Sequence, residues 1–554
     1  MIAVDAPEEE HEFIREFFEL FKTPWEHFHP GCSASVAIVS ADRAACFKGH
    51  AQLVIVYGSL PCAFDLQSGI ASNPAGNGTW IRYPGGRFPL YLGCLTFSGE
   101  GIGLCEESEQ RPVAHVTCSG EMKWIRLGYS PFLETGFLLA EGQPVENAIV
   151  PTLDRHIELL RRLIVSSGIP VVDIPPSPHG FRFTACLTHD VDHPAIRLHH
   201  FDRTSLGFGY RAIVGSVIDL VRGRASARHV AQNWLSVLKV PFVHLGLARD
   251  FWNTFHRYRT LEHSLGATYY FIPHRRTPGF APDGPAPVVR GAAYSLADVV
   301  AEMRDLRLAG CELGVHGISA WDDSASGLKE RDLVSQAAGE TVSGIRMHWL
   351  YFKRDSPRML EAAGYDYDST CGYNEVVGFR AGTVQAFRPP GAVELMELPL
   401  HVMDTALFFP AMMNLSDTAA RRVVSDLVDA FCDGGVLTTN WHDRSIAPER
   451  LWEAFYIWFL QMLKDRGAWF PTAKRAVAWF RKRRHAAFGP VGWDGHTLCG
   501  CVRVAHTDTM LPGLVLRVLK PSPRRATAAW SWDNSETHTE FGFNKTTPFS
   551  LRVP

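Results

Sequence analysis

Residues 183–192 read Phe-Thr-Ala-Cys-Leu-Thr-His-Asp-Val-Asp, an apolar run that ends in two carboxylates, Asp190 and Asp192. The run predicts a buried strand, and residues two apart on a strand point to the same side, so both carboxylates can reach one pocket. Like charges that close are costly unless a cation intervenes or one group is protonated. The pair therefore indicates metal-assisted hydrolysis, with one acid to hold a cation and the other to move a proton. A turn or helix cap is the alternative interpretation of an isolated pair.

The composition excludes several classes of protein. The 554 residues are 46% apolar and 20% charged, with a formal net charge of −3, as in an ordinary protein of two or more domains. The near balance of charge gives no reason to expect nucleic acid as a partner. We expect a cytoplasmic protein with reduced thiols, because the Glu-rich start is unlike a signal peptide and the 12 cysteines lack a framework spacing. No apolar run is long enough for a transmembrane segment, which leaves peripheral membrane contact open.

The sequence pattern changes twice along the chain, which predicts three α/β or β segments. The first, of unknown role, mixes strand-like runs with a helical pattern at 153–165 and precedes a proline-rich linker at 168–180. The second alternates helix and strand patterns, as parallel α/β folds do. The third has short strand-like runs and is expected to be a small β-rich appendage. The predicted domains are residues 1–175, 176–484 and 485–554.

A helical insertion is expected beside the candidate site. About 70 residues separate the acidic motif from the next predicted strand, at 268–272, and they contain helical patterns at 212–221 and 230–240. That length exceeds a simple crossover between parallel strands. We therefore place an inserted helical segment near residues 195–262.

Three further polar motifs follow predicted strands. His316 comes after the predicted strand Glu312-Leu313-Gly314-Val315 and lies between Gly314 and Gly317, which permit close backbone approach. Arg346 and His348 are two residues apart and can share a face. An arginine beside Asp190 would lower the pKa of that acid, and neutral imidazoles are good ligands for zinc, nickel or cobalt. Each residue also has a structural interpretation, as a core histidine or as part of a surface strand face.

His442 follows the apolar strand pattern 436–439 and is suited to donating a proton to a leaving amine. A helix cap is the alternative role for this histidine. Arg380 is a candidate substrate contact or loop anchor, and Trp441, beside His442, is a further candidate substrate contact.

Taken together, residues 181–445 resemble the polysaccharide deacetylase family, also called the NodB homology or carbohydrate esterase 4 group. The order of the motifs carries the resemblance: Thr-His-Asp-Val-Asp at 188–192, then the motifs of His316, Arg346 and His442. Further similarity, through Gly-Phe-Arg-Ala-Gly-Thr at 378–383, is to a subgroup with the same acidic motif that is associated with bacterial exopolysaccharide clusters. The resemblance implies a distorted (β/α) barrel of the NodB type with fewer than eight regular strands.

The resemblance also implies roles for the matched residues. Asp190 would be the general base, Arg346 would orient it, and His442 would be the general acid. Asp192 and His316 would bind the metal, and Leu437 would line the acetyl pocket. The family's second metal-binding histidine corresponds to Ala320, which cannot bind a metal. We infer that His348 supplies the missing ligand.

The activity expected from these motifs is metal-dependent hydrolysis of an N-acetyl group on a sugar, in a polysaccharide or its lipid-linked precursor. The reaction is that of a hydrolase acting on a linear amide C–N bond, with zinc as the expected metal and nickel or cobalt as alternatives. Two other functions stay open: a glycan-binding or scaffold protein that has lost activity, and a deformylase or other amide hydrolase with the same site. A separation of more than about 8 Å between Asp192 and His316 would contradict a shared ion, since metal bonds are roughly 2 Å long.

Overall fold

A computed structural model describes residues 1–554 except positions 33, 77, 100, 120–121, 201, 224, 432–433, 451, 505–509, 522–531, 533–536 and 554. The described residues form two units. The first combines residues 1–180, 381–385 and 479–554, and the second combines residues 181–380 and 386–478. In the described part of the chain every cysteine is a free thiol, and no helix has both the length and the apolar composition needed to cross a membrane.

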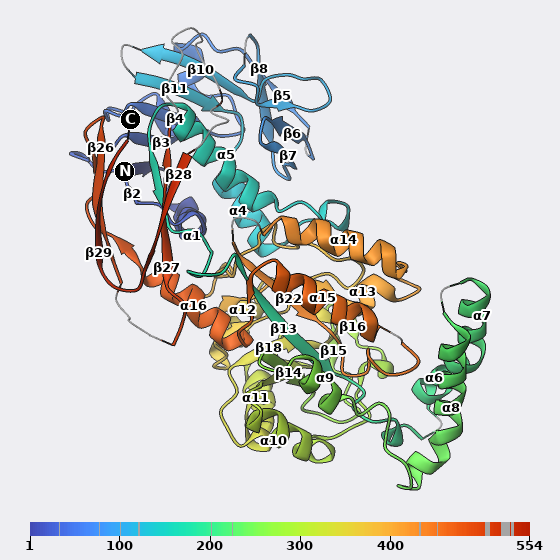
Figure 1. Ribbon diagram of the computed structural model, residues 1–554. Helices are drawn as coiled ribbons and strands as arrows, with labels where there is room; N and C mark the ends of the chain where they lie inside the picture. The colour runs from blue at the N-terminus through green and yellow to red at the C-terminus, as the bar shows by residue number, and fades with distance from the viewer. Residues whose placement is uncertain are drawn as a thin grey trace. The chain divides into compact units, whose positions relative to one another are not determined.

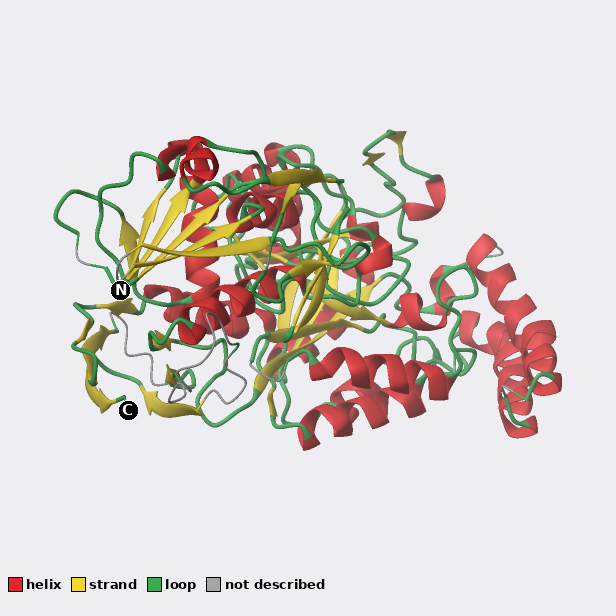
Figure 2. Ribbon diagram, turned by 90° about the horizontal axis from the view of Figure 1, so that it is seen from above, coloured by secondary structure: helices red, strands yellow, loops and turns green. Residues whose placement is uncertain are grey.

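The first unit is built on a six-stranded sheet, shown with its helices in Figure 2. Four of its five strand pairs are parallel, and the edge pair β10–β11 is antiparallel. The strands, in sheet order, are β10 (Ala114–Ser119), β11 (Met122–Leu127), β4 (Leu53–Tyr57), β3 (Val36–Ser40), β1 (Ile2–Asp5) and β2 (Trp25–His27). The main helices of this unit are α1 (His11–Phe21), α4 (Pro131–Ala140) and α5 (Thr152–Ser166). The helix expected at 153–165 is therefore confirmed as α5.

The C-terminal strands belong to this first unit and do not stand apart from it. Strand β27 (Leu514–Lys520) pairs on one side with β12 (Val171–Asp173) and on the other with β28 (Thr537–Phe543). Arg517 on β27 makes a buried two-point ion pair with Asp173 on β12, at 2.9 and 2.8 Å. A smaller sheet contains β24 (Ala487–Phe488), β26 (Thr497–Arg503), β25 (Gly492–Trp493) and β29 (Thr547–Arg552). Contacts between distant segments thus give two units in place of the three predicted domains.

The second unit is a parallel α/β sheet whose centre is β13 (Phe183–Val191), the strand predicted from the opening motif (Figure 1). All nine residues of β13 are buried, as in parallel sheets that are covered on both faces. The strands, in sheet order, are β20 (Met396–Glu397), β19 (Tyr367–Asp368), β18 (Gly344–Met347), β17 (Glu312–Gly317), β14 (Ala267–Phe271), β13, β22 (Val436–Asn440) and β21 (Leu400–Met403), and β23 (Ala468–Trp469) also pairs with β13.

The sheet closes into a distorted barrel. Strands β20 and β21 lie at opposite ends of the hydrogen-bonded order, yet only Leu398 and Pro399 separate them in the sequence. Three residue steps span at most about 11 Å, so the two ends of the sheet must meet. Every recorded pair in this sheet is parallel. The structure therefore confirms the distorted (β/α) barrel that the resemblance implied.

Helices connect the barrel strands, and the predicted insertion is present between β13 and β14. The connecting helices are α9 (Phe255–Leu261), α10 (Val300–Leu308), α11 (Ser324–Ala338), α12 (Ser356–Ala362), α13 (Asp404–Phe408), α14 (Asp417–Asp429) and α15 (Glu453–Asp465). The insertion forms a helical hairpin. Its first arm is α6 (Arg203–Tyr210), the π-helical turn η4 (Arg211–Gly215) and α7 (Ser216–Val221), and its second arm is α8 (Ala227–His244). Both figures show the hairpin projecting from the barrel.

Candidate metal centre

Six polar side chains predicted from the sequence come together at the carboxyl ends of the barrel strands. They come from β13 and its exit, from β17, from β18 and the turn after it, and from the loop after β22. Parallel strands place their carboxyl ends at one edge of the sheet, where ligands bind in α/β folds. The six residues are Asp190, Asp192, His316, Arg346, His348 and His442.

Asp190 is held by two donors. Its Oδ1 accepts a hydrogen bond from Arg346 Nη1 at 3.0 Å, and its Oδ2 accepts one from Asn440 Nδ2 at 2.7 Å. Burial acts to raise the pKa of Asp190, but the charges of His316 and Arg346 outweigh it, so the pKa lies below its usual value. Asp190 is therefore an oriented, ionised carboxylate at neutral pH.

Arg346 is itself fixed from three sides. Besides Asp190, its guanidinium donates to Thr188 Oγ1 at 2.7 Å and to the carbonyl oxygen and hydroxyl of Ser369, at 3.0 and 2.9 Å. It also lies over the ring of Tyr270, 4.8 Å from the centroid. The side chain is fully buried, so its position leaves Asp190 little freedom to turn.

Asp192, His316 and His348 form a group that could hold a metal ion. Asp192 Oδ1 lies 3.4 Å from His316 Nε2 and 3.6 Å from His348 Nε2, and the three ligand atoms all lie within 4.8 Å of one another. Asp192 Oδ1 is buried without a hydrogen-bond partner. Ligands at 2.0–2.2 Å from a tetrahedral zinc ion are separated by about 3.4 Å, so the donor set and its spacing fit a divalent ion. The separation is also far below the 8 Å that would have contradicted a shared ion.

His316 and His348 differ in the direction in which their surroundings shift the imidazole pKa. The Nδ1–H of His316 donates to the backbone oxygen of Arg346 at 2.9 Å, which directs Nε2 at the two aspartates. Such second-sphere bonds commonly set the tautomer of metal-binding histidines. Burial lowers the pKa of His348 to about 3, so this imidazole is neutral and able to bind a metal. Burial disfavours the charged form of His316 too, but Asp190 and Asp192 outweigh it and raise its pKa. The same negative charges would attract a cation.

His442 is paired with an acid that the sequence analysis did not identify, Asp404. The Nδ1–H of His442 donates to Asp404 Oδ1 at 2.6 Å, and the backbone N–H of His442 donates to Asp404 Oδ2 at 2.7 Å. Although burial acts to lower it, the negative charge of Asp404 raises the pKa of His442 to about 9. His442 therefore carries a proton at neutral pH, with Nε2 3.8 Å from Asp192 Oδ2.

Asn440 is the second residue that the sequence analysis missed. It ends β22, and its side chain bonds Asp190 through Nδ2 while its Oδ1 accepts from the Asp190 backbone N–H at 3.2 Å. A signal was available for both missed residues, because Asp404 and Asn440 each stand at the carboxyl end of a buried strand pattern. The rule that polar residues at strand ends mark the site would therefore have identified both Asp404 and Asn440.

Of the three candidate substrate contacts, two are completely buried and the third makes the contact of a loop anchor, the alternative given for it above. Trp441 is completely buried and stacks on Phe455 at 5.7 Å and on Tyr456 at 5.1 Å, so it packs in the core. Leu437 is also completely buried. It lies three residues before Asn440, and the strand alternation points it to the opposite face of β22, away from Asp190. Arg380 donates to the backbone oxygen of Gly372 at 2.9 Å, the contact of a loop anchor.

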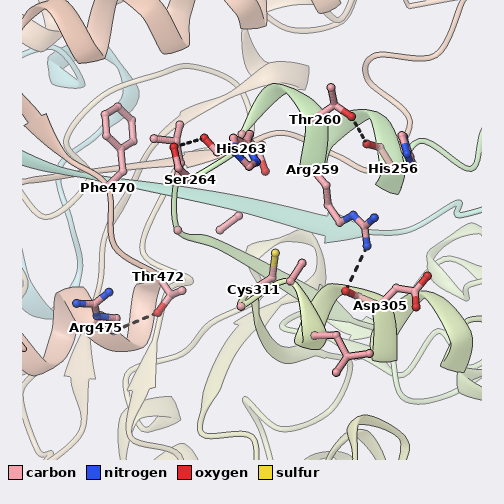
Figure 3. A pocket seen from close by; sticks show the side chains of 17 residues that line it. His256, Arg259, Thr260, His263, Ser264, Asp305, Cys311, Phe470, Thr472 and Arg475 are labelled. Atoms are coloured by element: carbon pink, nitrogen blue, oxygen red, sulfur yellow. Dashed lines mark hydrogen bonds between the residues drawn. The ribbon is translucent and has the colours of Figure 1, made fainter.

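A cavity at the other end of the barrel contains none of these residues. It has a volume of about 1050 Å³ and lies at the amino ends of β14 and β17, beside Ala267 and Cys311 (Figure 3). Figure 3 shows Arg259 donating to the backbone oxygen of Asp305 there, at 3.3 Å. The converging acids and histidines, and not this cavity, mark the candidate site.

No family model matches the sequence, and no curated protein matches it. Solved structures similar to the chain include a probable polysaccharide deacetylase from Pseudomonas aeruginosa PAO1, with 13% identity over 56% of this chain and 95% of that one and a TM-score of 0.34. The allantoinase PuuE matches with 13% identity over 55% of this chain and 92% of that one, with a TM-score of 0.33. A family 4 acetyl xylan esterase from Clostridium thermocellum matches with 13% identity over 53% and 91%, with a TM-score of 0.23.

Proposed function

We propose that this protein is a metal-dependent hydrolase that removes the N-acetyl group from a sugar of a polysaccharide or of its lipid-linked precursor. One observation carries the proposal. An ionised carboxylate, Asp190, and a protonated histidine, His442, flank a three-residue group that can hold a divalent ion. Metal-assisted amide hydrolysis uses this set: an electrophilic ion, a base for water and an acid for the leaving nitrogen.

Asp192, His316 and His348 would hold the ion. One carboxylate and two imidazoles suit zinc, with nickel and cobalt as alternatives. When bound, a divalent ion polarises the amide carbonyl and lowers the pKa of water towards about 7.

The remaining steps belong to the protein's own side chains. Asp190 accepts the proton of the water that attacks the acetamide carbon, while Arg346 and Asn440 keep its carboxylate oriented. His442 then donates its proton to the nitrogen as the C–N bond breaks, so that an amine and acetate separate. Asp404 holds His442 in the tautomer with Nε2 towards the reaction. Each such proton transfer is typically worth on the order of 10² to 10⁴ in rate.

The position of His348 bears on the alternative of an inactive glycan-binding protein. Ala320 removes one ligand that the resemblance led us to look for, but His348 stands within 3.6 Å of Asp192. The ligand set is therefore of the size found in catalytic zinc sites, which keep three protein ligands. This favours an enzyme over a scaffold.

The test is product analysis with the purified chain. N-acetylated and N-formylated hexosamine oligosaccharides are incubated with protein loaded with zinc, nickel or cobalt, and acetate and formate are assayed. We expect acetate release that depends on the metal. Formate release alone would identify a deformylase, and release of neither acid with the metal bound would favour glycan binding without catalysis.

A further inference from the structure

The outer side of the helical hairpin, residues 203–247, is apolar and exposed. Its inner side is packed, because Phe208, Ala212 and Val243 form a small buried cluster with Trp252. The fold of the hairpin is thus supported from within, and its outer apolar residues are not needed for that core. Scattered exposed apolar residues are normal on protein surfaces, but continuous stripes indicate a binding surface.

Helix α8 carries the clearest stripe. Its large apolar residues Trp234, Leu235, Leu238 and Phe242, with Leu245 just after the helix, are 48, 51, 68, 53 and 72% exposed. At 100° per residue these positions fall within one arc of about 100°. Val230, Asn233 and Ser236, which occupy the other side of the helix, are buried. In the described part of the chain, helix α8 therefore has one packed face and one apolar face that is largely exposed.

The first arm of the hairpin repeats this arrangement. Leu206, Tyr210, Ile213, Val217 and Leu220 recur every three or four residues through α6, η4 and α7, and are 63, 62, 46, 38 and 37% exposed. This spacing keeps them on one side of the arm. Two stripes of the same kind on two packed arms argue for a common function.

The charge of the hairpin is unlike that of the rest of the chain. Residues 203–247 contain six lysines and arginines and a single acidic residue, Asp219, whereas the whole chain has a net charge of −3. Arg228 and Lys239 are exposed, and their helical positions border the apolar stripe of α8. Cations beside an exposed apolar stripe that contains a tryptophan are typical of helices that lie in the interface of an anionic bilayer.

We propose that this hairpin binds the surface of a membrane that contains anionic phospholipid. The apolar stripes would enter the boundary between headgroups and acyl chains, while Arg228, Lys239 and their neighbours face lipid phosphates. A second copy of the chain fits less well, because two hairpins of high positive charge would repel each other. The inference does not depend on the proposed function. The hairpin lies between β13, which ends just before Asp192, and β14. Its residues Phe208, Ala212 and Val243 share a buried cluster with Ala447, which lies five residues after His442, so its base is close to the loop of the candidate site.

The test measures co-sedimentation of the full chain with vesicles of phosphatidylcholine alone or with about 30 mol% phosphatidylglycerol. We expect binding to the anionic vesicles, weakened by salt. The double variant Leu238→Glu, Phe242→Glu should bind at least about tenfold more weakly, since it puts charge on the apolar stripe. Arg228→Glu with Lys239→Glu should remove the preference for anionic lipid. Leu308→Glu, at a 69% exposed leucine of α10, is the matched control and should bind like the wild type.

The proposal would be overturned if the wild type did not bind vesicles, or if the Leu238 and Phe242 variant bound them equally well. It would also be overturned if the wild type formed oligomers, the variant were monomeric, and the two proteins bound vesicles equally. The last result would assign the surface to a second copy. Circular dichroism establishes that each variant is folded. Asp190→Asn, which lacks the proposed base, should bind vesicles like the wild type. Membrane binding is thereby tested independently of the proposed hydrolase activity.

Discussion

The charged side chains of the candidate site differ in whether they have hydrogen-bond partners within the protein. Asp190 has two hydrogen-bond donors and His442 has a dedicated carboxylate, Asp404. Asp192 Oδ1 has no donor and faces two imidazole nitrogens. A buried carboxylate oxygen without a partner is costly, and a cation is the group that would satisfy it. This difference in pairing supports the proposed roles of Asp190 as the base and Asp192 as a metal ligand.

Replacing Asp190 by Asn should abolish turnover while the metal stays bound. The amide cannot accept the proton of water, and Asp190 is not one of the three grouped ligands. We expect a loss of kcat on the order of 10² to 10⁴, as for other general bases. Metal content by mass spectrometry and kcat on the same preparation measure both effects. Loss of the metal in this variant would make Asp190 a ligand.

His348→Ala and Asp192→Ala should each lose the metal. With only two protein ligands left, affinity falls because a catalytic zinc site normally keeps three. Metal content after dialysis measures the effect, with circular dichroism as the check on folding. The control is His256→Ala, an exposed histidine at the other end of the barrel. A His348→Ala protein that retains one ion per chain would disprove the ligand assignment.

Among the secondary-structure elements, β18 and the turn after it place two residues of the candidate site. Arg346 lies on the strand, but His348 lies beyond it, in a turn where Trp349 and Leu350 have φ angles of 66° and 55°. Non-glycine residues rarely adopt this left-handed conformation, and it costs free energy. Arg290 donates twice to the backbone oxygen of His348, at 3.3 and 2.8 Å, and so holds the turn. The turn brings the His348 imidazole to Asp192.

Helix α13 contributes Asp404 at its first position, and Asp404→Asn tests whether that acid positions His442. We expect kcat to fall by on the order of 10² to 10⁴, while KM and metal content stay close to the wild-type values. A purely structural role would change stability but not kcat selectively. Asp417→Asn, at the start of α14, is the control. A wild-type kcat for Asp404→Asn would remove Asp404 from the mechanism.

Glycine at position 314 is required by the packing of β17 against its neighbours. A Cβ there would lie 2.6 Å from the ring of Tyr270 and 3.0 Å from the backbone oxygen of Gly344. Gly314→Ala should therefore lower the free energy of unfolding by about 1–3 kcal/mol, as overpacking does. Urea unfolding measures the change.

The control for that substitution is Gly209→Ala in α6, where a Cβ meets nothing within 4 Å. That change should be neutral or stabilising, because alanine favours helix over glycine. Equal stability of the two alanine variants would show that the close packing around Gly314 is relaxed in solution.

Over the full chain, the division into two units predicts that a bound metal would act on the barrel alone. The sheet of the first unit contributes none of the three ligands, which all come from residues 192–348. Binding to the folded state alone stabilises it, by about 2.7 kcal/mol when the free ion is at 100 times its Kd. A bound metal should therefore stabilise the barrel and leave the stability of the first unit unchanged.

Removal of the metal with a chelator should therefore speed amide hydrogen exchange in β13, β17 and β18 while β3 and β4 exchange as before. Adding the ion back should restore protection. His348→Ala serves as the internal control, since it should exchange alike with and without the ion. Equal changes in both units would show that the ion acts on the chain as a single cooperative unit.

Much of the barrel and of the site could be predicted because the signals are local. A polar residue directly after an apolar strand pattern marks Asp190, His316 and His442, and parallel strands bring such ends together. The helical insertion followed from the length of one connection. Predicting the candidate metal-binding group required one further inference, that His348 supplies the ligand that Ala320 cannot.

The remainder needed the tertiary structure, since it depends on pairing between distant segments. Asn440 meets Asp190 across 250 residues because β13 and β22 pair in one register. The same register turns Leu437 to the opposite face and buries it. The closure of the sheet by β20 and β21, the partner of His442 and the assignment of the C-terminal strands likewise follow from contacts between segments far apart. Local patterns record which residues end a strand, but hydrogen-bond partners and side-chain burial are chosen only when the strands come together.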